Sequence, residues 1–446
     1  MLWLAGCASL PNHDEQATHA PAPVLGESAR LQPNSAEAVI QAVAGADTAQ
    51  TRVQTNKLWD AVRKATDSPF ILGNRVTPLV DGPETFTHIR RAITDAKSSV
   101  HIETYIFADD KFGRSFAQLL IDKAHQGVEV RVILDAFGSV ASTDALFDSM
   151  RQAGVQVQVF HPLAPLRTLP WHYNNRDHRK LLIVDGRVAF AGGINISGTY
   201  SSGSASRPGP QLGVTEGWRD THSQIEGPAV RLFQAIFFET WVGLGGQVDA
   251  GNAKYFPTVD ARGMDIVSAV VSTGVRQRDE AIYSTYLAAV NNAAERVWIT
   301  QAYFSPPPEL RDALIAAAHR GVDVRILVPG FTDSGPVFYA ARAGYKKLLD
   351  GGVHIYEMTN ALLHAKTAVI DNSLTAIGSA NLDYRSFLHN NEITAVVASE
   401  NLASQMAAIF KKDLDAAREL SAEQWRHRSL GEKLKESVSH LFNYWL

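Results

Sequence analysis

An internal repeat constrains the fold of this 446-residue chain more than any other feature of its sequence. Residues 100–107 resemble residues 297–304, and residues 124–131 resemble residues 318–325. The copies lie about 190 residues apart, which is too long for a solenoid, whose repeats run to about 50 residues. The sequence therefore predicts two duplicated domains.

Each half combines a helical pattern, a glycine and a β-branched-rich run. In the first half, residues 116–124 place apolar side chains on one helical face, Gly127 stands at the position of a helix cap, and residues 128–134 suit a buried strand. The second half repeats these features at 310–318, Gly321 and 322–328. Alternating βα units of this kind predict an α/β fold, with a mixed, largely parallel sheet flanked by helices in each half.

Composition divides the chain further. The overall balance of 45% hydrophobic and 20% charged residues is typical of a globular protein. Residues 8 to about 50 are instead rich in Pro, Ala, Ser, Gln, Asp and His, which favours a disordered tether. We therefore expect a tether over 1–55, a first domain over 56–250 and a second domain over 251–446 that ends in a helix.

Charge and cysteine content exclude several classes of protein. The net charge of −4 lacks the basic excess of a nucleic-acid binder, although a local basic groove stays possible. A single cysteine excludes an intramolecular disulfide and a cysteine-rich zinc site. No stretch reaches the roughly 20 apolar residues that span a bilayer.

The first residues resemble a bacterial lipobox. Leu4-Ala5-Gly6-Cys7 has the sequence of a lipoprotein cleavage and lipidation site, but the basic and long apolar regions of a signal peptide do not precede it. Two interpretations remain open. Either the true start lies upstream and Cys7 is lipidated, which implies a periplasmic lipoprotein, or the resemblance is accidental and the protein is peripheral to the inner membrane.

Two sets of polar residues recur at identical spacing. In both halves a lysine follows a histidine by two residues, an aspartate follows the lysine by five, and an asparagine follows the histidine by seventeen. Two complete sets in a duplicated chain are a specific signal, whereas one His-x-Lys is not. The sets are His178, Lys180, Asp185 and Asn195 in the motif 178–195, and His364, Lys366, Asp371 and Asn381 in the motif 364–392.

The spacing predicts how each set is arranged. His178 and Lys180 face the same side of a strand, which turns at Asp185 and returns over 188–191 so that Asn195 comes back near His178. An imidazole, an ammonium and a carboxamide together suit an anionic phosphoryl group. They suit a metal poorly because a nearby lysine repels a cation, so we expect no metal and no cofactor.

Each histidine should have an acidic partner. Glu392 follows the second motif and opens a strand, and aligning the strands of the two halves puts Asp220 at the matching position, beyond an insertion rich in Gly, Ser and Pro. A carboxylate on one ring nitrogen fixes the tautomer and raises the basicity of the other nitrogen. We therefore expect Glu392 and Asp220 to orient the histidines, each acid being counted from the motif of its own half.

The paired His-x-Lys-x4-Asp motifs resemble the signature of the phospholipase D superfamily. The resemblance covers about residues 70–425, and residues 378–386 with Asn391-Glu392 are most similar to bacterial cardiolipin synthases. It implies two phospholipase D-like α/β/α domains that meet at one pseudo-twofold active site. The lipobox-like start departs from synthases that carry N-terminal membrane spans.

The resemblance also implies a mechanism. One histidine attacks phosphorus to give a phosphatidyl-histidine, and the other protonates the leaving alcohol and then deprotonates the incoming one. We expect His178 to be the nucleophile and His364 the acid and base, with the opposite assignment open. The remaining roles are charge stabilisation by Lys180, Lys366, Asn195 and Asn381, and structural support by Asp185 and Asp371 at the hairpin turns.

Three functions follow as hypotheses. The first is phosphatidyl transfer between phospholipids to give cardiolipin. The second is hydrolysis, by a phospholipase D or, less in keeping with the net charge, a nuclease. The third is lipid binding by a lipoprotein without turnover. The expected partners are phospholipid substrates and a membrane surface, with no nucleic acid, and an apolar loop at 163–171 is a candidate to pack on the core or to line an acyl-chain groove.

Overall fold

The computed structural model describes residues 49–66, 68–162, 174–204, 217–249, 253–274, 280–332 and 334–440. Cys7, most of the expected tether and the apolar loop at 163–171 lie outside these residues. Within them, no helix has both the length and the apolar character that a membrane span requires.

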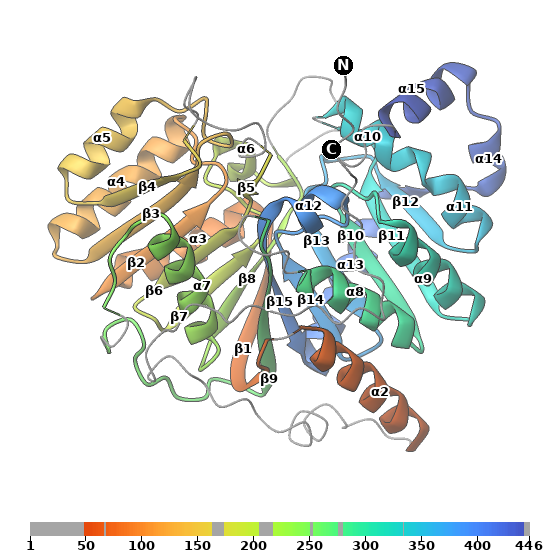
Figure 1. Ribbon diagram of the computed structural model, residues 1–446, viewed down its shortest axis with the longest axis horizontal. Helices are drawn as coiled ribbons and strands as arrows, with labels where there is room; N and C mark the ends of the chain where they lie inside the picture. Colours follow the sequence, from red (N-terminus) through yellow and green to blue (C-terminus); the bar gives the residue numbers. More distant parts are fainter. Residues whose placement is uncertain are drawn as a thin grey trace.

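The first half alternates strands and helices and then forms a hairpin (Figure 1). Its elements are β1 (Ile71–Val80), α3 (Asp81–Asp95), β2 (Ser99–Thr104), α4 (Lys111–His125), β3 (Glu129–Asp135), α5 (Asp144–Gln152), β4 (Gln156–Phe160), β5 (Arg176–Asp177), β6 (Lys180–Val184), β7 (Val188–Gly192), α6 (Gly198–Ser201), β8 (Thr221–Glu226) and α7 (Val230–Gly243). Helix α2 (Ala49–Thr66) precedes them.

The second half repeats this order and adds helices near its end. Its elements are β9 (Asp265–Ser272), α8 (Ala281–Asn292), β10 (Arg296–Gln301), α9 (Pro308–His319), β11 (Asp323–Pro329), α10 (Gly335–Ala343), α11 (Tyr345–Asp350), β12 (His354–Met358), β13 (Lys366–Ile370), β14 (Leu374–Gly378), α12 (Tyr384–Leu388), β15 (Asn390–Ala398), α13 (Glu400–Leu414), β16 (Ala417–Glu419), α14 (Ala422–Arg426) and α15 (Leu430–His440).

The strands of both halves form one continuous sheet. Its order is β16-β12-β11-β10-β13-β14-β15-β9-β1-β8-β7-β6-β2-β3-β4, so the two halves run outward from the central pair β1 and β9. Strands β2, β3 and β4 are parallel, as are β10, β11 and β12. The expected α/β halves with a mixed sheet are confirmed, but antiparallel pairs outnumber parallel ones because each motif lies on a hairpin.

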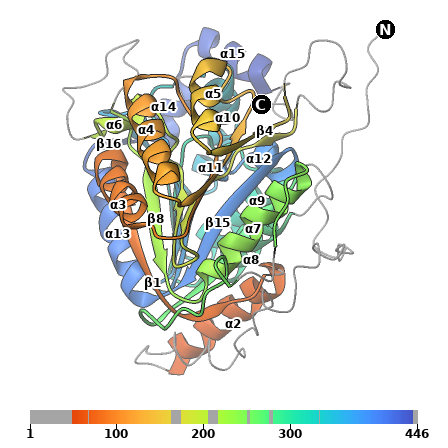
Figure 2. The same ribbon diagram turned by 90° about the vertical axis from the view of Figure 1, so that its left-hand side faces the viewer.

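Helices cover both faces of the sheet (Figures 1 and 2). One core lies in the first half around α3, α4 and α5, and another lies in the second half around α8 and α9. A third core is shared, because α7 of the first half and α13 of the second bury Phe237 and Phe410 in the same cluster. The halves are therefore packed together rather than linked loosely.

Helix α2 lies against the second half, where Leu58, Trp59 and Val62 are buried with residues of α8. The predicted first domain begins at residue 56 and includes this part of α2, which instead packs on the second half. The division at 250 and 251 stays a prediction, since the shared core and the continuous sheet cross it.

Asn74 forms hydrogen bonds at the centre of the sheet, where β1 pairs with β9 and the register shifts. Its fully buried side chain donates to the carbonyl of Ile71 at 2.6 Å and to that of Asp265 at 3.3 Å, and it accepts from the amide of Ala229 at 2.8 Å. It thus connects the two central strands with the start of α7.

We predict that Asn74→Ala lowers the free energy of unfolding by about 2–4 kcal/mol, because it leaves buried backbone groups without partners. Chemical denaturation of the whole chain measures this change. The matched control is Arg75→Ala, whose half-exposed side chain pairs with Glu226 at 3.5 Å and should matter little. Equal losses in the two variants would contradict the role given to Asn74.

Candidate active site

Both motifs lie at the same edge of the sheet. Lys180 opens β6 and pairs with Thr104, the last residue of β2, while Lys366 opens β13 and pairs with Gln301, the last residue of β10. The motifs therefore meet the carboxyl ends of the parallel strands, an edge at which α/β sheets commonly bind ligands.

The segment before each motif is held by the other half. Strand β5 runs parallel to the start of β15, and the amide of His178 donates to the carbonyl of Asn391 at 2.9 Å. In the reverse direction, the amide of His364 donates to the carbonyl of Arg219 at 2.7 Å. Two exchanged backbone connections thus bring the motifs together.

The acidic partners are exchanged in the same way. His178 Nδ1 lies 2.9 Å from Glu392 Oε1, and His364 Nδ1 lies 2.7 Å from Asp220 Oδ2. Both carboxylates are fully buried. Both residues expected as orienting acids contact a histidine. Each acid contacts the histidine of the opposite half, and the spacing of residues within one half does not reveal this exchange.

Burial sets the charge states of these pairs. It lowers the pKa of His178 to about 4 despite the nearby charge of Glu392, and it also lowers the pKa of His364. Burial would raise the pKa of Glu392, but His178 and Lys180 outweigh it and lower that pKa. Each free-state pair is therefore a neutral imidazole that donates Nδ1–H to a carboxylate, and this leaves the Nε2 lone pair for chemistry.

Each lysine contacts the backbone of the histidine two residues before it. Lys180 Nζ donates to the carbonyl of His178 at 2.6 Å, and Lys366 Nζ donates to the carbonyl of His364. Burial lowers the pKa of Lys180 to about 7. Two buried amines beside two imidazoles make a site that a phosphodiester anion would stabilise.

The two asparagines differ in their contacts. Asn195 accepts from the amide of Ile106 at 3.2 Å and donates to the hydroxyl of Tyr200 at 2.9 Å, and that hydroxyl lies 3.4 Å from His364 Nδ1. Asn381 is buried, and its Oδ1 has no hydrogen-bond partner among the described residues. Sequence reasoning missed Tyr200, although it follows Asn195 by five residues just as Ser386 follows Asn381.

Asp185 and Asp371 occupy the far ends of the motif strands. Asp185 accepts from the amides of Lys97, Ser98 and Ser99, and Asp371 accepts from the three amides at 294–296. Both have left-handed backbones, with φ of 53° and 51°. Each aspartate directly follows a five-residue strand that begins with the lysine, and these contacts support the structural role expected for both aspartates.

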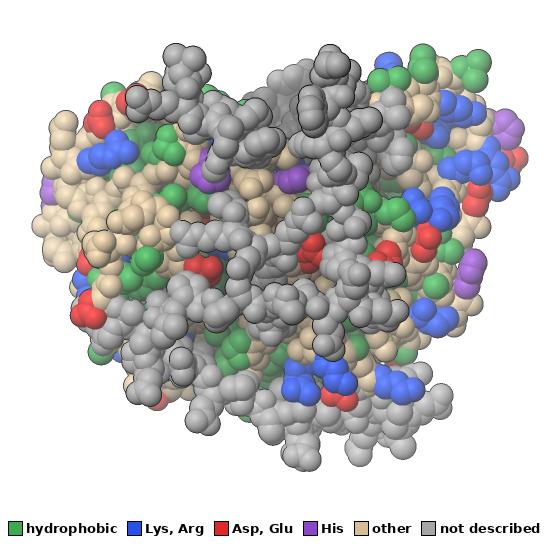
Figure 3. All heavy atoms as spheres, in the orientation of Figure 1, with side chains coloured by type: hydrophobic (Ala, Val, Ile, Leu, Met, Phe, Trp, Pro, Cys, Tyr) green, Lys and Arg blue, Asp and Glu red, His purple; other side chains and the backbone are tan. Residues whose placement is uncertain are grey.

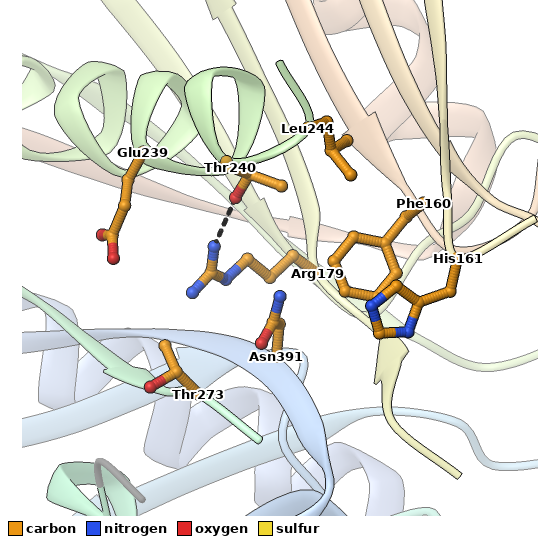
Figure 4. Close-up of a pocket in the computed structure, with 9 residues that line it drawn as sticks. Phe160, His161, Arg179, Glu239, Thr240, Leu244, Thr273 and Asn391 are labelled. Atoms are coloured by element: carbon orange, nitrogen blue, oxygen red, sulfur yellow. Dashed lines mark hydrogen bonds between the residues drawn. The ribbon is translucent and has the colours of Figure 1, made fainter. Parts of the chain in front are cut away.

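The residue between His178 and Lys180 faces the opposite side of the strand. Figure 4 shows Arg179 pointing into a cavity of about 160 Å³ that is also lined by residues of α7 and by Asn391. Its guanidinium donates to Thr240 at 2.9 Å and to the carbonyl of Glu392 at 3.3 Å. Arg179 therefore ties α7 to β15 instead of entering the site.

Comparison with known proteins decides the family. The family model described as "Cardiolipin synthase, PLD-like domain" matches residues 89–203 and 286–414. The chain belongs to the cardiolipin synthase family. It is 33% identical to the cardiolipin synthase of Halalkalibacterium halodurans over 86% of this chain and 75% of that protein, and 33% identical to the major cardiolipin synthase ClsA of Bacillus subtilis over 84% and 76%.

A solved structure supports the fold alone. Phosphatidylserine synthase from Haemophilus influenzae superposes with a TM-score of 0.67 over 87% of this chain and 100% of that chain, at 13% sequence identity. Within the described residues, no group of three or more His, Cys, Asp or Glu could hold a metal ion.

The two motifs differ at one position beside the orienting acids, and this difference matches the lengths of Asp220 and Glu392. Ser379 donates its hydroxyl to Glu392 Oε2 at 2.6 Å. The first motif has Gly193 at this position, where a Cβ atom would lie 2.1 Å from Asp220 Oδ1. The glycine lets the shorter acid reach His364, whereas the serine supports the longer one.

We predict that Glu392→Gln changes the ring nitrogen signals of His178 and leaves those of His364 in place, with Asp220→Asn doing the reverse. Removing the negative charge lowers the pKa of the histidine that loses its partner. NMR titration with nitrogen-labelled histidine measures this, with signals assigned from the two His→Ala variants. A response of each histidine to the acid of its own half would contradict the exchanged pairs.

Proposed function

We propose that this chain transfers a phosphatidyl group from one phospholipid to the hydroxyl of another. Two phosphatidylglycerols would give cardiolipin and release glycerol. Family membership supports this reaction, and the observation that carries it is the pair of complete, exchanged histidine–carboxylate units at one edge of the sheet. The duplication supplies both histidines from one chain.

In the first step, His178 Nε2 attacks the phosphorus of the donor lipid. A P–N bond forms and the P–O bond to glycerol breaks, while His364 gives a proton to the departing oxygen. The neutral state of His178 favours this role, since protonation would remove its lone pair. Burial and, after it, the charge of Lys366 lower the pKa of His364, and a bound phosphodiester anion offsets the lysine charge so that His364 gains its proton as the substrate binds.

In the second step, His364 takes the proton from the acceptor hydroxyl, whose oxygen attacks the phosphatidyl-histidine. The P–N bond breaks, and His178 returns to its free state with Glu392 holding the Nδ1 proton. Lys180, Lys366, Asn195 and Asn381 stabilise charge on the phosphoryl oxygens. The same site hydrolyses the intermediate if water replaces the acceptor lipid.

The chain would act at a membrane surface, because its substrates would be bilayer lipids. Lipidation of Cys7 would put it in the periplasm as a lipoprotein. Without that modification it would be peripheral to the inner membrane.

Cardiolipin-deficient bacteria that express this chain test the reaction. We expect lipid mass spectrometry to find cardiolipin with the wild type and a loss of at least about a thousandfold with His178→Ala or His364→Ala. The matched control is His354→Ala, an exposed histidine on β12 that should keep full activity. Raised phosphatidic acid without cardiolipin would show a hydrolase, and no lipid change would favour a binding protein.

The lowered pKa values predict an acidic optimum for kcat/KM on detergent-dispersed phosphatidylglycerol. The rate should rise as the pH falls below 6.5, because His364 then gains its acidic proton, and should fall near pH 4 as His178 loses its lone pair. Rates measured over this range, with circular dichroism to confirm folding, check the prediction. A maximum on the alkaline side of 6.5 would contradict it.

A further inference from the structure

Helix α15 is attached to the protein through its charged side. Glu436 is buried, pairs with Arg428, and lies 3.8 Å from the guanidinium of Arg342 on α10. Lys435 Nζ lies 5.3 Å from the ring centre of Tyr339, also on α10. Ion pairs and cation–π contacts therefore hold α15 against α10.

The opposite side of α15 exposes an apolar stripe. Leu430, Leu434 and Val438 recur every fourth residue and are 84%, 65% and 49% exposed. A surface helix normally buries such a stripe against the core. Figure 3 shows hydrophobic side chains beside lysines and arginines on this part of the surface, at the upper right. This reversal leaves apolar area available to an external partner.

A second exposed apolar group lies on the other half. Phe137 and Val140 are more than half exposed in the turn that follows β3. Helix α10, which carries α15, follows β11, the counterpart of β3. Both groups therefore lie beyond the carboxyl ends of equivalent parallel strands, the edge that holds the histidines. Figures 1 and 2 both place α5, α10 and α15 at this upper end.

We propose that the stripe of Leu430, Leu434 and Val438, together with Phe137 and Val140, docks on an anionic phospholipid bilayer. Docking there turns the active-site edge toward the membrane, so that a lipid headgroup reaches the histidines without leaving the bilayer. The inference rests on the proposed function, since lipid substrates give the site a reason to face a bilayer.

The charges beside the stripe favour a bilayer over a second copy of the chain. Lys433 and Lys435 flank Leu434 along the helix, and Lys435 is exposed although its ammonium also contacts Tyr339, so an anionic lipid surface attracts both lysines. A symmetric dimer through this stripe would cover the edge at which lipid substrates enter.

Vesicle sedimentation of the full chain tests the surface. We expect Leu430→Ser/Leu434→Ser/Val438→Ser to bind vesicles of phosphatidylglycerol and phosphatidylcholine about tenfold less than wild type, because three apolar side chains no longer enter the interface. The matched control is Met264→Ser, which removes an equally exposed side chain (75%) just before β9, at the other end of the sheet, and should bind like wild type.

Turnover in detergent separates this proposal from the proposed function. The triple variant should keep wild-type activity on detergent-dispersed phosphatidylglycerol, which also shows that it folds. Unchanged vesicle binding by the triple variant would overturn the docking surface, as would a change confined to the oligomeric state in light scattering. If wild type has no turnover in detergent, the proposed function fails, and sedimentation still decides the docking.

Discussion

The exchanged histidine–carboxylate pairs are the interaction on which the rest of the structure depends. Each pair joins a residue of one half to a residue of the other, so neither half holds a complete acid–base unit. The continuous sheet through β1 and β9, the shared core of α7 and α13, and the ion pair of Arg219 with Asp413 at 2.7 Å hold the halves in one position. Because a hydrogen bond weakens steeply with distance, this rigid contact is a condition for chemistry.

The site is electrostatically incomplete without an anion. While both imidazoles are neutral, the two carboxylates balance the two buried lysines, so a protonated His364 would have no counter-charge. Burial disfavours every additional positive charge here, and it lowers the pKa of Lys180 to about 7. A phosphodiester supplies the missing negative charge and restores the protonated forms that stabilise the reaction. Substrate binding thus offsets part of the free-energy cost of burying these charged groups. Binding of the phosphodiester and protonation of His364 therefore occur together.

Local features of the fold could be predicted from the sequence because they depend on short-range periodicity. The hairpins at Asp185 and Asp371, the shared face of His178 and Lys180, and the two acids all follow from spacing within one motif or from aligning the halves. The exchange of acids, the β5–β15 pairing and the contact of Tyr200 with His364 depend on packing between segments far apart in the chain. No local pattern encodes that packing.

Duplication alone would make the two histidines equivalent, whereas a two-step transfer needs them to differ. The surroundings of the two histidines are not the same. Glu392 accepts from the hydroxyl of Ser379 and from the side-chain carboxamide of Asn390 at 3.2 Å, and these donors favour its ionised form and hold it against His178. His364 has a shorter acid, Asp220, which accepts from the backbone amide of Thr221 at 2.7 Å, and a nearby phenol, Tyr200. A firmly held neutral tautomer suits attack on phosphorus, while polar contacts on the other imidazole suit repeated proton exchange, so the asymmetry supports His178 as the nucleophile.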